Sequence, residues 1–184
     1  MVDKTKKCLI DAKKNKQKHF LLIQKANIQA RKQAMIDESK SIIHFASGVA
    51  RLSPIPLSDM PIITTTQMAM IYKMNRAFKV KMEDSVAASL ITGLLAVTAI
   101  GQTAKTIVAN LIKFIPGVGS VVGAVISGAT AAIITEGIGF AYLKVLKKCF
   151  NDEIGEVKLP AMDTIKSLFK ESYLSLDTIK KLKD

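Results

Sequence analysis

The first 50 residues carry one apolar stripe with the spacing of an α-helix. Neither proline nor glycine interrupts residues 3–47, and lysine or arginine fills many of the positions between the apolar ones. Apolar side chains that recur every seven residues share one helical face. The pattern predicts one or two amphipathic helices over residues 3–52, whose stripe is Leu21, Leu22, Ile28, Met35, Ile36, Ile42, Ile43, Val49 and Ala50.

A methionine stripe follows a break of three prolines in residues 52–61. Ser58 or Asp59 can cap a new helix, and Pro61 is tolerated in its first turn because no intrahelical donor is needed there. Apolar residues at i, i+4 and i+8 predict a helix over residues 62–80 whose core-facing side is Met70, Met74 and Phe78. An adaptable partner groove is the alternative use of such a stripe.

The middle of the chain holds two uncharged runs, residues 85–104 and 114–135. Pro116 and Gly117 predict a turn that makes the second run part of a hairpin, and Pro160 can start a last amphipathic helix. We therefore expect an all-α fold, a helical bundle with a long basic amphipathic N-terminal helix and a central hydrophobic helical hairpin. The chain divides into a basic segment, a hydrophobic helical domain and a C-terminal amphipathic helix, at residues 1–51, 52–150 and 151–184.

The net charge of +12 is concentrated in the first quarter of the chain. Residues 1–51 hold 12 Lys or Arg against 4 Asp or Glu. A basic segment joined to an apolar body attracts an anionic surface, either nucleic acid or an anionic membrane leaflet. Nucleic acid is disfavoured because Phe20 and Phe45 are the only aromatic residues there and no stacking platform results. The expected membrane contacts are Lys13, Lys14, Lys16 and Lys18.

No pattern for catalysis, for a cofactor or for a metal is found. The glycines of residues 117–123 lack the lysine that a phosphate-binding loop needs. His19 and His44 are the only histidines, and neither has metal ligands beside it at helical spacing. Cys8 and Cys149 fit free thiols in a reducing compartment, and the start of the chain has no signal-peptide pattern. We expect a cytoplasmic protein that is not an enzyme and holds no cofactor.

Glu136 interrupts an apolar helix after 22 uncharged positions. In a soluble bundle it would lie at an edge or pair with a lysine such as Lys105 or Lys113. In a membrane its cost would imply a function or a partner. Gly119 and Gly123 form a GxxxG pair, which lets helices approach closely in lipid or in a tight soluble bundle.

Two separated motifs resemble those of a bacterial helical domain of unknown function. The first is Pro54, Pro56 and Asp59 followed by Gln67 and Met70, and the second is the turn that contains Lys113, Ile115, Pro116, Gly117 and Gly119. In that family the domain commonly follows an Era-like or interferon-inducible-type GTPase domain, and it also occurs in small inner-membrane proteins. The match covers about residues 42–146, and no GTPase domain precedes it. The resemblance therefore implies a membrane-proximal module that works with a GTPase in trans, and it transfers no catalytic residue.

Three functions remain open on the sequence alone. The leading one is a non-enzymatic module that associates with the inner membrane, either peripherally or through the inserted hairpin. The second is a soluble adaptor in which residues 113–136 form a buried core helix, and the third is a pore-forming hairpin protein. The expected partners are an anionic membrane, a GTPase or another protein, and a second copy of the chain in a homo-oligomer.

Overall fold

The computed structural model describes residues 2–52, 60–81, 83–99 and 128–175. Within these ranges all regular secondary structure is helical apart from one two-stranded sheet, so the all-α prediction is confirmed. The predicted hairpin turn at Pro116 and Gly117 lies outside the described residues. The elements in chain order are α1 (Val2–Arg51), α2 (Met60–Ala77), α3 (Asp84–Ala99), α5 (Gly128–Lys148), β1 (Phe150–Asn151), β2 (Glu156–Val157) and α6 (Met162–Leu174).

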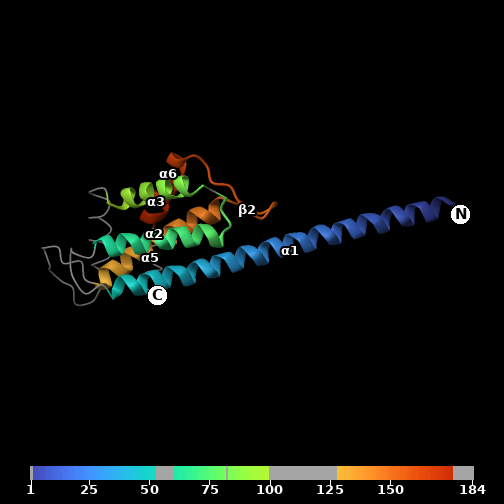
Figure 1. The fold of residues 1–184 in the computed structure, drawn as a ribbon. Coiled ribbons are helices and arrows are strands. Elements are labelled where there is room, and N and C mark those ends of the chain that lie inside the picture. Colours follow the sequence, from blue (N-terminus) through green and yellow to red (C-terminus); the bar gives the residue numbers. More distant parts are fainter. Residues whose placement is uncertain (1, 53–59, 82, 100–127, 176–184) are drawn as a thin grey trace.

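Helix α5 is the centre of the bundle. It packs against the C-terminal half of α1, against α2 and against α6, while α3 closes the far side by contacting α2 and α6. Figure 1 shows α1 along one edge of this bundle and continuing as a single straight helix far beyond it. The described core is therefore built by segments on both sides of residue 52. The division of the chain at residues 51 and 150 stays a prediction.

The apolar stripe of α1 is buried over only part of its length. Met35, Ile36, Ile43 and Ala50 are buried as the heptad spacing predicts, whereas Leu21 is exposed. All 50 residues form one helix, which is about 75 Å long. A helix of that length outruns the bundle, so the same sequence pattern continues where no other described element covers it.

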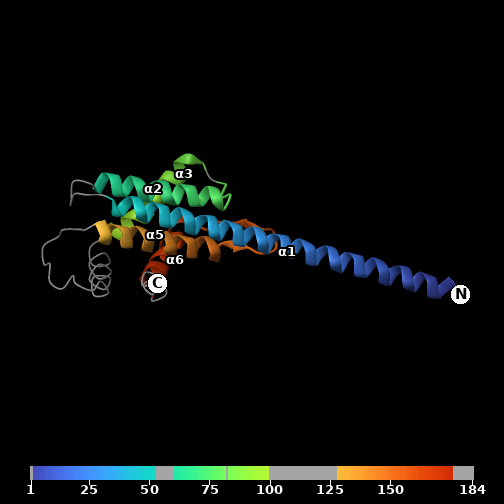
Figure 2. The same cartoon turned by 90° about the horizontal axis from the view of Figure 1, so that it is seen from below.

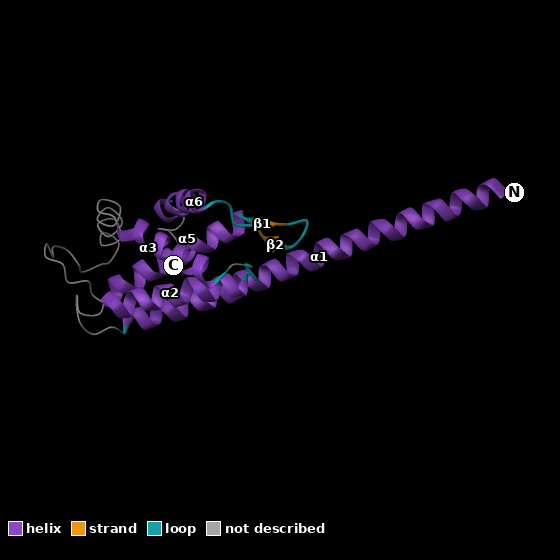
Figure 3. Cartoon of the chain, turned by 45° about the horizontal axis from the view of Figure 1, so that its top comes forward, coloured by secondary structure: helices purple, strands orange, loops and turns teal. Residues whose placement is uncertain are grey.

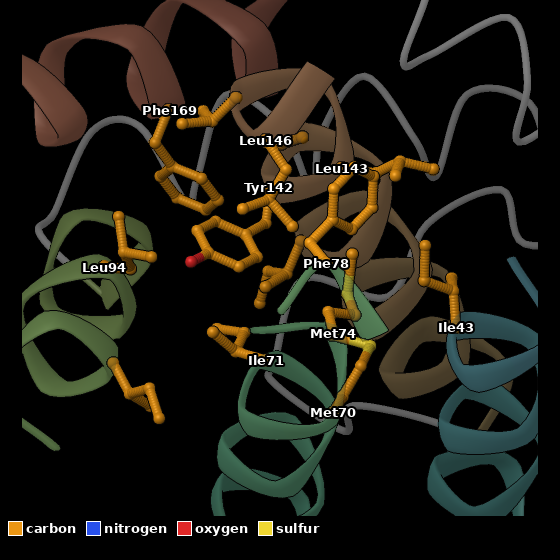
Figure 4. Close-up of a cluster of buried hydrophobic side chains, with 14 of the residues drawn as sticks. Ile43, Met70, Ile71, Met74, Phe78, Leu94, Tyr142, Leu143, Leu146 and Phe169 are labelled. Atoms are coloured by element: carbon orange, nitrogen blue, oxygen red, sulfur yellow. The ribbon is translucent and has the colours of Figure 1, made fainter. Parts of the chain in front are cut away.

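The methionine stripe of α2 faces the core, as predicted. Met70, Met74 and Phe78 are all within 1% of complete burial. Figure 4 shows them beside Ile43 of α1 and Tyr142 of α5. The helix ends at Ala77 and does not continue to residue 80, because Lys79 takes a left-handed φ of 53°. The amides of the two residues after Phe78 donate back to the carbonyls of Arg76 and Asn75, which satisfies the end of the helix.

Glycine at position 139 lets α5 approach α1 and α2 closely. A Cβ atom at this position would lie 2.6 Å from Cγ1 of Ile43 and 3.0 Å from Sδ of Met70. Both of these side chains are fully buried and cannot move aside without displacing the core. Helices α1, α2 and α5 therefore meet at Gly139, where the space is too small for any side chain larger than the hydrogen of glycine.

Two buried hydrogen bonds tie α2 to α5. The Tyr142 hydroxyl donates to Oδ1 of Asn75, and Nε2 of Gln67 donates to Oγ1 of Thr135 at 3.1 Å. All four residues are buried. Pairs of this kind fix the register of the two helices, since a shift would leave buried polar groups unpaired.

The segment after α5 forms a small two-stranded hairpin. Phe150 pairs with Val157 and Asn151 pairs with Glu156. Gly155 allows the tight turn with a φ of +71°. Helix α6 then begins after Pro160, as predicted, but it ends at Leu174 because Ser175 is extended, and residues 176–184 of the predicted helix lie outside the described residues.

We predict that Gly139→Ala lowers the free energy of unfolding by about 1–3 kcal/mol, because overpacking outweighs the better helix propensity of alanine. Gly48→Ala is the matched control, since nothing lies within 4 Å of a Cβ atom there, and it should leave stability unchanged or raise it by up to about 1 kcal/mol. Urea unfolding of both variants measures the difference. Equal effects of the two substitutions would contradict the close approach.

The buried tyrosines predict a loss of stability in alkali. Burial raises the pKa of Tyr173 to about 12 and also raises the pKa of Tyr142. Since the folded pKa lies above the unfolded value of about 10, this stabilisation is complete below that value and is lost as pH rises toward the folded pKa. In urea unfolding between about pH 10 and 12, the free energy of unfolding should fall less for Tyr173→Phe than for the unmodified chain. Identical losses would contradict the assignment.

Candidate functional site

The N-terminal part of α1 is the most unusual surface of the described molecule. Every residue from Lys6 to Asn27 is exposed, and we call this segment the arm. At 1.5 Å per residue it extends for about 33 Å. Figure 2 shows that the arm extends well beyond the other helices and ends far from them.

The arm combines strong positive charge with large apolar side chains. It contains seven lysines and a single acidic residue, Asp11. The predicted contact residues Lys13, Lys14, Lys16 and Lys18 are all exposed on it. The structure adds apolar residues that are between 52% and 64% exposed, namely Leu9, Ile10, Phe20, Leu21, Leu22 and Ile23. Large apolar side chains are thus exposed along the arm, most densely at residues 20–23.

One side of the arm is both apolar and basic. At 100° per residue, Ile10 and Leu21 fall on nearly the same side of the helix as Lys14, Lys18 and Lys25. Lysine side chains beside an apolar strip can extend toward phosphate groups while the strip enters the acyl region. This side of the arm therefore combines apolar and basic side chains within one narrow arc of the helix.

The β1–β2 hairpin contacts α1 at the point where the arm extends beyond the bundle. Asp152 accepts hydrogen bonds from Nζ of Lys32 at 2.8 Å and from Nε2 of Gln29 at 3.1 Å. The hydrogen bond from Lys32 is the main reason why the pKa of Asp152 is lowered. The Lys32 ammonium also lies 4.9 Å from the centre of the Phe150 ring. Figure 3 shows the hairpin beside α1 at this point, and the contacts fix the direction in which the arm projects.

Glu136 contacts His44 at the edge of the bundle. Its carboxylate lies 2.9 Å from Nδ1 of His44, and its side chain is 21% exposed. The His44 ring also meets Phe140 edge to face. The edge position was expected, but His44 as the partner was not, because 92 residues separate the two in sequence and only the packing of α1 on α5 brings them together.

The family-motif residues divide into two groups. Gln67 and Met70 are buried between α2 and α5 and serve packing. The other motif residues, Pro54, Pro56 and Asp59, lie outside the described residues, and so do Gly119 and Gly123 of the predicted GxxxG pair. A close-packing glycine does occur in the described part, at Gly139, where sequence reasoning did not single it out.

No metal site competes with the arm in the described ranges. Among those residues no group of three His, Cys, Asp or Glu could hold a metal ion. A groove of about 210 Å³ between α1 and α2 is lined by Ile42, Phe45, Val49 and Lys73, among others. That volume is below the roughly 300–1,000 Å³ of typical small-molecule sites. None of the helices in the described ranges is both long enough and apolar enough to cross a membrane.

Comparison with known proteins gives one similar protein and a family for this chain. It is 27% identical over 129 residues to Magnetosome membrane protein 22 of Magnetospirillum gryphiswaldense. The aligned region covers 70% of this chain and 63% of that protein. The chain thus spans less than two thirds of the length of this relative. No solved structure matches. The model of a domain of unknown function, DUF697, matches residues 15–172 and so includes most of the arm together with the bundle, and the chain belongs to this DUF697 family.

Proposed function

We propose that the chain is a non-enzymatic module that associates peripherally with an anionic membrane through its arm. The observation that carries the proposal is the side of the arm on which Ile10 and Leu21 lie among Lys14, Lys18 and Lys25, all exposed. The similarity to a magnetosome membrane protein supports it. The inner membrane, approached from the cytoplasm, is the proposed location.

Two forces would act in sequence at the membrane. The lysines attract the anionic surface from a distance, at about 1 kcal/mol for each one near the surface. The apolar side chains then enter the boundary between headgroups and acyl chains, where the gain is about 25 cal/mol for each Å² of apolar area removed from water. The first force is screened by salt and the second is not. Binding through the arm should therefore become partly salt-resistant once the apolar residues are inserted.

We also propose that the bundle works with a GTPase supplied in trans. The support is the resemblance of the two motifs to a domain that commonly follows a GTPase domain. The test is capture of an Era-like GTPase by the immobilised full chain, with GTP and then with GDP. Capture that depends on GTP would support the proposal, and equal absence of binding in both states would contradict it.

A soluble adaptor is the second candidate, and one observation favours it. Ala131, Ala132 and Thr135 belong to the apolar run that ends at Glu136, and all three are buried inside the bundle. That end of the run is therefore core. An adaptor would use the arm to bind an acidic protein surface, so failure to bind vesicles would direct the search to that class of partner.

We predict that replacing Lys13, Lys14, Lys16 and Lys18 by glutamate weakens binding to anionic vesicles at least about 100-fold, since four favourable charges become repulsive. Flotation of the full chain with the vesicles at low salt measures the change. The matched control replaces four exposed lysines of the bundle segments by glutamate, namely Lys79, Lys81, Lys158 and Lys170. Equal weakening in both variants would show that net charge, and not the arm, controls binding.

A high-salt wash of the floated complex separates the two forces. We predict that the unmodified chain stays bound and that Leu21→Glu is washed off, because it loses the buried apolar contact while keeping every lysine. If salt releases the unmodified chain completely, the arm touches only headgroups.

A further inference from the structure

A second exposed face of α1 runs without interruption from the arm onto the bundle. Its residues are spaced alternately four and three apart, which is the repeat of a two-helix seam. Every one of them is exposed, although the later ones belong to the part of α1 that packs on α5 through its other side. We call this face the seam, and it consists of Leu9, Lys13, Lys16, Phe20, Ile23, Asn27, Ala30, Ala34, Asp37 and Ser41.

The two halves of the seam differ in side-chain size. The arm half holds the large apolar residues Leu9, Phe20 and Ile23, which are 57%, 59% and 60% exposed. The bundle half holds Ala30 and Ala34. Large side chains pack well against small ones on a facing helix. Leu9 in the arm half of one copy can therefore pack on a small side chain in the bundle half of another copy.

Charge selects the direction in which two seams can pair. Parallel pairing would set Lys13 against Lys13 and Lys16 against Lys16, which is repulsive. Antiparallel pairing about a point between residues 21 and 22 sets Lys13 opposite Ala30 and Lys16 opposite Asn27. The lysine stems can then cover the small side chains while their ammonium groups stay in water.

The same antiparallel register places the remaining seam residues favourably. Leu9 meets Ala34, and Phe20 of each copy meets Ile23 of the other. Lys6 comes to the level of Asp37, which is exposed and acidic. Antiparallel pairing also separates the six lysines of residues 6–20 from the same six lysines of the second chain. They lie instead beside residues 23–37 of that chain, which hold only three basic residues.

We propose that two copies of the chain associate through an antiparallel coiled coil of their α1 helices, with Phe20 of each copy packed on Ile23 of the other. The dimer has two-fold symmetry, so each contact occurs twice. The two helices overlap over residues 6–37, which is about 48 Å of helix. The bundles lie at opposite ends of this rod.

The seam and the basic apolar side of the arm occupy different faces. Phe20 and Ile23 lie on the seam, whereas Leu21 lies roughly 100–160° away around the helix. A dimer would therefore leave Leu21, Lys14 and Lys18 of both copies available. The dimer forms in solution without lipid, so its test is independent of membrane binding.

Light scattering of the full chain during size exclusion gives the test of association. We expect the mass of a dimer for the unmodified chain, and a dissociation constant raised at least about 100-fold by Ile23→Glu, because the charge is buried on both sides of the axis. Leu22→Glu is the matched control, since Leu22 is adjacent, 56% exposed and off the seam, and it should remain dimeric. A monomeric unmodified chain, or equal effects of the two substitutions, would overturn the proposal.

Disulfide cross-linking tests the direction of pairing. In a chain with Cys8→Ser and Cys149→Ala, we expect the double variant Leu9→Cys with Ala34→Cys to form covalent dimers on mild oxidation. Positions 9 and 34 are about 37 Å apart on one helix, so a bond within one copy is excluded. Each single variant should stay uncross-linked. Dimers from Leu9→Cys alone would show parallel pairing and overturn the proposed arrangement.

Discussion

The close approach of α5 to α1 and α2 at Gly139 is the contact on which the rest of the bundle depends. Ile43 and Met70 fill the space that a side chain at 139 would need, so three helices share one tightly packed point. This contact holds the C-terminal half of α1 in the core, and the hydrogen bonds of Asp152 to Gln29 and Lys32 hold it again at the edge. The arm continues a helix that is held by these two sets of contacts.

The arm places charge and apolar surface where no other described element covers them. A soluble monomer gains nothing by exposing Phe20, Leu21, Leu22 and Ile23 together. These four residues point in four directions around the helix, so one flat surface cannot cover them all. A bilayer against the side of Leu21 and a second α1 against the side of Ile23 would together remove most of this area from water.

The sequence predicted the helices and their apolar faces better than the contacts that each helix makes with the others. Heptad spacing found α1, and the methionine stripe found the buried side of α2, because both depend on local periodicity. The point where burial of α1 stops could not be predicted, since Leu21 continues the stripe beyond the end of the bundle. The pairing of His44 with Glu136 and the close approach at Gly139 are contacts between helices distant in sequence. The left-handed end of α2 at Lys79 had no signal, because neither glycine nor asparagine stands there.

The central claim is that the arm, and not the bundle, meets the membrane. Cys8 is exposed on the arm, so an environment-sensitive dye can be attached there in a chain that carries Cys149→Ala. A second chain carries the dye on α6, through Lys170→Cys with Cys8→Ser and Cys149→Ala. The account predicts that anionic vesicles shift the emission of the arm dye to the blue, that a lipid-borne quencher reduces it, and that the α6 dye changes little. A response of the α6 dye without one from the arm dye would contradict the account.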